Sequence, residues 1–191
     1  MEQRTVSPDA VVIGIGCPYR RDDGVGPAVL DRLAAMWAGD RRFSDFPALV
    51  TCDGDVTRLI GIWERAASAV VVDAAQSVGL GRPGTVRRFD LADTELQHGP
   101  LPASSHGLGL AEAVALAHAL GRLPARLVVY TVEAADTGVG NGLSPDVAAA
   151  VDEAAGRVAA EIARNDFAAG SAGDPSIDRR VRGAAGQQTS A

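Results

Sequence analysis

Residues 11–16 read VVIGIG, a continuous apolar run that ends in glycines. A run without alternation is typical of a central strand buried on both faces, and such a strand needs helices on both sides of a parallel sheet. Residues 69–73, AVVVD, form a second run of this kind, which ends on a carboxylate. The two runs favour an α/β fold, and an aromatic content of only 4% argues against an aromatic-rich sandwich.

The remaining segments complete this pattern. Further short strands are expected at three places, residues 48–51, 85–89 and 127–132. Apolar residues recur at helical spacing in four segments, residues 27–37, 53–66, 104–120 and 145–162. Ser144 is expected to cap the last helix, with Pro145 in its first turn. The alternation predicts a three-layer αβα sandwich with a mainly parallel central sheet of about five strands.

The length of the chain fits one domain. With 191 residues, 47% of them hydrophobic, the chain can bury a core. We expect an N-terminal extension at residues 1–10 and a single α/β domain at residues 11–165. Residues 166–191 are rich in Gly, Ala, Ser, Gln and Arg without periodicity, so we expect a disordered tail there.

Charge and cysteine content exclude several classes of protein. A formal net charge of −6 argues against general binding to nucleic acid or an anionic membrane, because either needs a clustered basic face. The first ten residues lack the apolar stretch of a signal peptide, and no run is long enough to span a bilayer. Two cysteines are too few for a disulfide framework, so the expected compartment is a reducing cytoplasm.

The glycine-rich loop after the first strand does not fit a nucleotide. A dinucleotide-binding fingerprint needs a third glycine where Tyr19 stands, and a P-loop needs Lys followed by Ser or Thr. The loop instead brings Asp22 and Asp23 to the start of the next helix, where carboxylates would repel a pyrophosphate. A nucleotide-binding enzyme is therefore a weak alternative. Either aspartate also has an ordinary explanation, because acidic residues stabilise the N-terminus of a helix.

Three side chains are candidates for a functional site beyond the carboxyl ends of the strands, where open α/β sheets bind ligands. Asp23 follows the first strand, Asp73 ends the second buried run, and His106 lies in a Ser-Ser-His-Gly turn before a helix. Two carboxylates and an imidazole form a mixed oxygen and nitrogen ligand set that suits a divalent ion such as Ni²⁺ or Zn²⁺. A catalytic triad of Ser105, His106 and Asp73 is disfavoured, because the chain has no Gly-x-Ser-x-Gly elbow.

Four ordered blocks of sequence resemble the hydrogenase maturation endopeptidases. They lie between about residues 11 and 165 and read VIGIG with DDGVG (12–16, 22–26), VVDAA with GRPGTV (71–75, 81–86), SSHGLGL (104–110) and GNGLSPDV (140–147). Each block is modest alone, but four in the same order are hard to obtain by chance.

This resemblance implies a role for the three candidate side chains. In the family, the residues at the positions of Asp23, Asp73 and His106 bind nickel, and the enzyme removes a C-terminal peptide from the nickel-loaded large-subunit precursor of a [NiFe] hydrogenase. The resemblance thus implies that the nickel is the ion carried by the precursor, with zinc or cadmium able to replace it in vitro. We favour the hypothesis that nickel docks the precursor while Asp23 or Asp73 acts as the base of an aspartic-type endopeptidase.

Two positions depart from the family pattern, and two other readings stay open. Cys17 stands where Asn is usual, and Glu133 is not followed by the common proline. One alternative is a non-proteolytic protein that binds nickel or a small ligand on the same scaffold. Another is a protease of this family that acts on a different metalloprotein. The sequence leaves the oligomeric state open.

Overall fold

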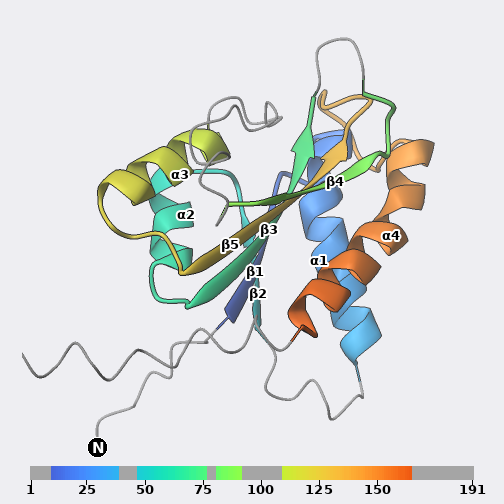
Figure 1. The fold of residues 1–191 in the computed structure, drawn as a ribbon. Helices are drawn as coiled ribbons and strands as arrows, with labels where there is room; N and C mark the ends of the chain where they lie inside the picture. The colour runs from blue at the N-terminus through green and yellow to red at the C-terminus, as the bar shows by residue number, and fades with distance from the viewer. Residues whose placement is uncertain (1–9, 39–46, 77–80, 92–108, 165–191) are drawn as a thin grey trace, which may run out of the picture.

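Five strands form one sheet in the order β2-β1-β3-β5-β4 (Figure 1). The computed structural model describes residues 10–38, 47–76, 81–91 and 109–164. Their strands are β1 (Ala10–Ile15), β2 (Ala48–Cys52), β3 (Ser68–Ala75), β4 (Val86–Asp90) and β5 (Arg126–Glu133). Their helices are the 3-10 helix η1 (Arg21–Gly24), α1 (Val25–Trp37), α2 (Val56–Trp63), α3 (Gly109–Ala119) and α4 (Pro145–Ile162).

The predicted three-layer architecture is confirmed. β1 pairs in parallel with β2 and β3, and β3 pairs in parallel with β5, whereas β4 is an antiparallel edge strand. Helices α1 and α4 cover one face of the sheet, and α2 and α3 cover the other (Figure 1). The sheet is therefore mainly parallel and lies between two helical layers, as the unbroken apolar runs require.

The burial of β3 shows why its sequence is apolar throughout. All eight of its residues are buried. Because successive side chains of a strand point to opposite faces, Val70 and Val72 pack in the core formed with α1 and α4. Val71 packs in the other core, where it shares a cluster with Trp63 of α2 and Ala113 of α3.

Two element boundaries and one helix cap differ from the sequence-based expectation. β3 does not end at Asp73, because Ala74 and Ala75 continue its pairing with β5. Helix α2 begins later than residue 53, because Asp55 caps it by accepting a hydrogen bond of 2.8 Å from the Arg58 amide. Ser144 does precede α4, but its side chain makes no capping hydrogen bond.

Helices in the described part of the chain lack the combination of length and hydrophobicity that a bilayer span requires. The expected tail at residues 166–191 and residues 1–9 of the expected extension lie outside the described residues, whereas Ala10, the last residue of that extension, begins β1.

A buried carboxylate fastens the end of α4 to β4 and β5. Glu161 is 1% exposed. It accepts hydrogen bonds from Arg88 Nε at 2.7 Å, Arg126 Nη2 at 2.8 Å and the Tyr130 hydroxyl at 3.0 Å. The bond from Arg88 outweighs the effect of burial and lowers the pKa of Glu161. Burial and this carboxylate together raise the pKa of Tyr130 to about 12.

We predict that acid destabilises the fold partly through Glu161. A carboxyl group with a lowered pKa in the folded state binds fewer protons there than in the unfolded chain, whose reference value is 4.5. Its stabilising effect is therefore present above that pH and is lost as the pH falls through the folded pKa. Glu161→Gln should lower the free energy of unfolding at neutral pH by about 2 kcal/mol, because two partly exposed arginines lose the buried carboxylate that they bind. It should also flatten the acid dependence in urea titrations at several pH values.

The matched control is Glu153→Gln, on the same helix. Glu153 is exposed and pairs with Arg157 at the surface, so its loss should change stability little. Equal acid dependence in wild type and Glu161→Gln would contradict the assignment.

Candidate functional site

The loop after β1 folds back closely over the end of its own strand. Gly16 has a φ of +141°, and a Cβ atom there would overlap the Asp23 carbonyl oxygen. Gly26 lies so near the sheet that a Cβ atom would overlap the Ile15 carbonyl oxygen and stand 2.8 Å from that of Val72. Only glycine fits this approach, and it holds η1 and the start of α1 against β1 and β3.

Asp23 is buried in this loop, with 1% of its surface exposed. Its Oδ2 accepts a hydrogen bond of 2.9 Å from the Cys17 amide. In a phosphate-binding loop, such an amide would donate to the bound phosphate. Here it donates to the Asp23 carboxylate, which argues against a nucleotide site. The contact uses the backbone of residue 17, so it does not depend on the Cys17 side chain.

Asp73 lies within β3, two residues before the strand ends, and is also 1% exposed. It pairs in register with Thr131 of β5. By the alternation of a strand, its side chain points to the same face of the sheet as that of Val71, the face covered by α2 and α3. β1 and β3 are neighbours and η1 packs against β3, so Asp23 and Asp73 come from elements that are in contact.

His106 lies outside the described residues. Helix α3, which begins shortly after it at Gly109, packs on the face toward which Asp73 points. Among the described residues, no three His, Cys, Asp or Glu side chains are grouped closely enough to hold a metal ion. The ligand set of Asp23, Asp73 and His106 therefore stays a prediction, and it needs His106 to be complete.

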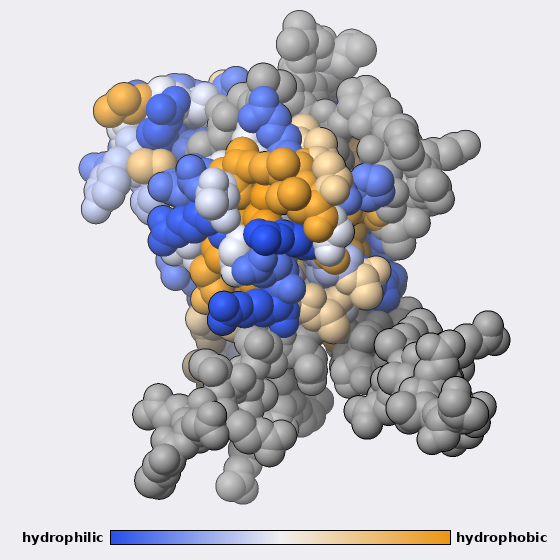
Figure 2. Space-filling model, turned by 90° about the vertical axis from the view of Figure 1, so that its left-hand side faces the viewer, coloured by the Kyte–Doolittle hydropathy of each residue, from blue (hydrophilic) through white to orange (hydrophobic). Residues whose placement is uncertain are grey.

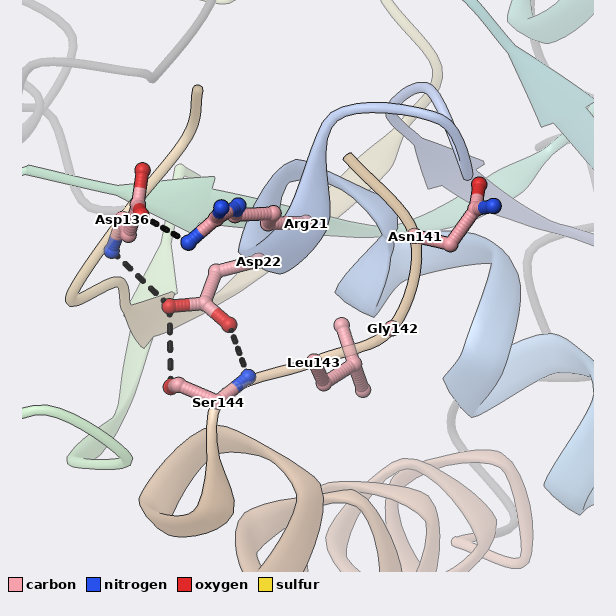
Figure 3. A pocket seen from close by; sticks show the side chains of 7 residues that line it. All are labelled: Arg21, Asp22, Asp136, Asn141, Gly142, Leu143 and Ser144. Carbon is pink, nitrogen blue, oxygen red and sulfur yellow. Dashed lines mark hydrogen bonds and ion pairs between the residues drawn. The ribbon is translucent and has the colours of Figure 1, made fainter. Parts of the chain in front are cut away.

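Asp22 is the important site residue that the sequence analysis missed. It is fully buried, and its carboxylate accepts four hydrogen bonds from the loop between β5 and α4; those from Asp136 and Ser144 are drawn in Figure 3. Oδ2 accepts from the amides of Ala135 and Asp136 at 2.9 and 3.0 Å and from the Ser144 hydroxyl at 2.9 Å. Oδ1 accepts from the Ser144 amide at 2.6 Å. The hydroxyl expected to cap α4 is thus used to bind Asp22.

These bonds set the ionisation of Asp22. Burial alone would raise its pKa, but the hydrogen bonds from Ser144, Asp136 and Ala135 lower it below the ordinary value of 3.8. Asp22 is therefore a carboxylate under working conditions, with both oxygens already accepting hydrogen bonds. This makes it a structural group rather than a base. The sequence shows an aspartate at a helix terminus and, much later in the chain, the GNGLSP block at residues 140–145. It does not show that the two pack together, because that contact forms only in the folded protein.

A hollow of ≈ 180 Å³ lies beside this carboxylate (Figure 3). It is lined by seven residues, Arg21, Asp22, Asp136, Asn141, Gly142, Leu143 and Ser144. Arg21 Nη1 and Asp136 Oδ2 form an ion pair of 2.6 Å at its edge, and both side chains are about half exposed. An exposed pair of this kind adds little stability, whereas Asp22 binds the loop residues 135, 136 and 144 directly.

We predict that Asp22→Asn destabilises the protein by about 2 kcal/mol or more at neutral pH, because an amide NH₂ group would face buried donors that have lost their acceptor. The loss should shrink in acid as the wild-type carboxylate becomes protonated, since its pKa lies below 3.8. Chemical denaturation at neutral and acid pH would measure both effects. Asp31→Asn, an exposed aspartate of α1, serves as the control and should be neutral. A wild-type-like stability of Asp22→Asn would contradict the structural role.

Comparisons with known proteins give the family of this chain. A model of the hydrogenase maturation protease family matches residues 52–161, more than half of the chain. No curated protein matches it.

Several solved structures share the fold. The [NiFe] hydrogenase maturation protease HybD from Thermococcus kodakarensis has a TM-score of 0.64 and 23% identity over 80% of this chain and 98% of its own. The hydrogenase maturating endopeptidase HybD from E. coli has a TM-score of 0.60 and 23% identity over 80% and 90%. HycI from Thermococcus kodakarensis KOD1 has a TM-score of 0.55 and 23% identity over 82% and 92%. The chain belongs to the hydrogenase maturation protease family and is a peptidase of that family.

Proposed function

We propose that this chain removes a C-terminal peptide from the nickel-loaded large-subunit precursor of a [NiFe] hydrogenase. The observation that carries the proposal is the family match over residues 52–161, together with two buried carboxylates on contacting elements beside the end of β1. Open α/β sheets bind ligands beyond the carboxyl ends of their strands, and both carboxylates lie toward that end of β1 and β3.

The two carboxylates differ from Asp22 in what surrounds them. Asp22 accepts four hydrogen bonds from one loop and holds structure. The Asp23 carboxylate instead accepts from the Cys17 amide in the loop after β1, and Asp73 lies on β3, the strand next to β1, so both lie toward the carboxyl ends of these two strands. We assign Asp23 or Asp73 as the general base of an aspartic-type peptidase.

Peptide hydrolysis at this site needs one proton transfer at each stage. The ionised carboxylate removes a proton from water as the water oxygen bonds to the scissile carbonyl carbon. The tetrahedral intermediate collapses as the C–N bond breaks, and the protonated carboxyl group returns the proton to the departing amine. No covalent enzyme intermediate forms.

The ligand types of Asp23, Asp73 and His106 suit a nickel ion that is already bound in the substrate. The two carboxylates supply hard oxygen ligands and His106 a nitrogen ligand, a combination that nickel and zinc accept. Three protein ligands leave coordination positions for groups of the precursor. We therefore propose that Asp23, Asp73 and His106 recognise nickel already bound in the precursor, so that only loaded precursor is positioned for cleavage.

The proposal also includes a cytoplasmic location and a protein partner. Cys17 and Cys52 are free thiols, as expected in a reducing cytoplasm. The expected partner is the large-subunit precursor itself.

We predict that the purified protein shortens nickel-loaded precursor and leaves nickel-free precursor intact, as followed by the mass of the precursor. Whichever of Asp23→Asn and Asp73→Asn removes the general base should lower the cleavage rate by roughly 100-fold or more, because a general base typically contributes that factor. His106→Ala should lower cleavage through weaker capture of the loaded precursor.

Asp53→Asn is the matched control. Asp53 follows the neighbouring strand β2 but is exposed and pairs with Arg58, so the variant should cleave normally. Cleavage of nickel-free precursor at the normal rate would exclude nickel recognition. Full activity of both Asp23→Asn and Asp73→Asn would exclude the carboxylate base.

A further inference from the structure

Thr131 is a buried polar side chain that lies beside Asp73 in the sheet. It is 5% exposed and pairs in register with Asp73, which is 1% exposed. Both side chains point to the same face, because the strands alternate and the residues two positions before them, Val71 and Val129, belong to one core cluster. Neighbouring strands lie about 4.8 Å apart, a separation that a hydroxyl and a carboxylate in register can bridge with a hydrogen bond.

The face to which both side chains point is covered by α2 and α3. Figure 2 views the molecule from the side of these two helices and shows apolar groups among polar ones on its surface. Thr131 and Asp73 lie beneath this layer, each two residues before the carboxyl end of its strand. A substrate is therefore expected to reach Asp73 past the ends of the strands rather than through the helices.

Thr131 differs in chemistry from the other side chains that flank Asp73 on this face of the sheet. The others are apolar, namely Val71 and Ala75 on β3 and Ile15 on β1, which follows the pair of Gly14 and Val72. A buried carboxylate requires hydrogen-bond donors or a cation. Among these four flanking side chains, only that of Thr131 can donate a hydrogen bond to it.

Glu133, two residues further along β5, points to the same face but has a different place. A Cβ atom at Gly81 would stand 2.1 Å from its Cδ, so the Glu133 carboxyl group packs against the segment that leads into β4. An ionised carboxylate has only acceptor oxygens. Glu133 in that form therefore has no hydrogen bond to donate to Asp73.

We propose that Thr131 is a positioning residue for Asp73, to which its hydroxyl donates a hydrogen bond in the complex with the precursor. The bond holds one oxygen of the carboxylate and leaves the other for the attacking water or for the nickel of the precursor. Thr131 itself contacts no reacting atom. This inference rests on the proposed function, and it adds a side chain that acts through Asp73.

The substitution Thr131→Val separates this role from simple packing. Valine keeps the β-branched shape and favours a buried strand, so a residue that only fills space should tolerate the change. If Thr131 orients Asp73, the variant should lower kcat/KM for nickel-loaded precursor about tenfold, the effect of losing a hydrogen bond to a charged group. Its melting temperature should be equal to that of wild type or higher. Thr131→Ser keeps the hydroxyl and should retain about half of kcat/KM or more.

A second measurement asks whether the effect passes through Asp73. In an Asp73→Asn background, with residual cleavage followed over long incubations, adding Thr131→Val should change kcat/KM by less than about twofold. The two changes are then coupled, because the group that Thr131 orients has already been altered. A further tenfold loss in this background would make the two residues independent and would overturn the inference.

Ser68→Ala is the matched control. Ser68 is a buried hydroxyl residue at the opposite end of β3, so its loss should leave kcat/KM unchanged. A normal kcat/KM for Thr131→Val, an equal loss in Thr131→Ser or in Ser68→Ala, or a lower melting temperature of Thr131→Val would each overturn the inference. If wild type itself fails to cleave loaded precursor, the proposed function fails; if wild type cleaves and Thr131→Val matches it, only the role of Thr131 fails.

Discussion

The geometry of the candidate site depends on one buried carboxylate. Asp22 is completely removed from solvent, and a buried charge without compensation would cost several kcal/mol. It is compensated by the loop between β5 and α4, which gives it three amides and a hydroxyl. The loop in turn has its amides satisfied by Asp22. Each loop therefore has its observed shape only in the presence of the other.

Several features follow from this mutual requirement. The start of α4 is placed by Ser144, and the hollow beside Asp22 is closed by the same loop. Asp23 is the next residue along the chain, so the direction of its carboxylate toward the Cys17 amide depends on how Asp22 is held. Helix α4 is fastened near both ends by buried carboxylates, Asp22 at its start and Glu161 near its end. The second of these involves no residue of the candidate site, so stability at that end is separate from the chemistry.

The sequence predicted those strands and helices whose apolar pattern follows from the faces they bury. The unbroken apolar runs of β1 and β3 required helices on both faces of the sheet, and helical spacing located α1 and α4. It did not predict the end of β3, because the strand continues past Asp73 only through pairing with distant residues of β5.

Contacts with distant residues also decide the different roles of the two neighbouring aspartates, which the sequence alone could not predict. Asp22 and Asp23 look alike in sequence, and only the position of residues 135–144 in the fold makes Asp22 structural and leaves Asp23 on the candidate site. The third predicted ligand, His106, lies outside the described residues, so its place remains a prediction.

The separation in sequence between Asp22 and its partners has a consequence for how the protein is made. These contacts join residues 113 to 122 positions apart, and such long-range contacts form late because a long loop must close first. A chain emerging from the ribosome would have β1 and β3 before the segment that fixes Asp22 has been synthesised. The arrangement around Asp23 can therefore be completed only once residues 135–144 have been synthesised and have packed against Asp22.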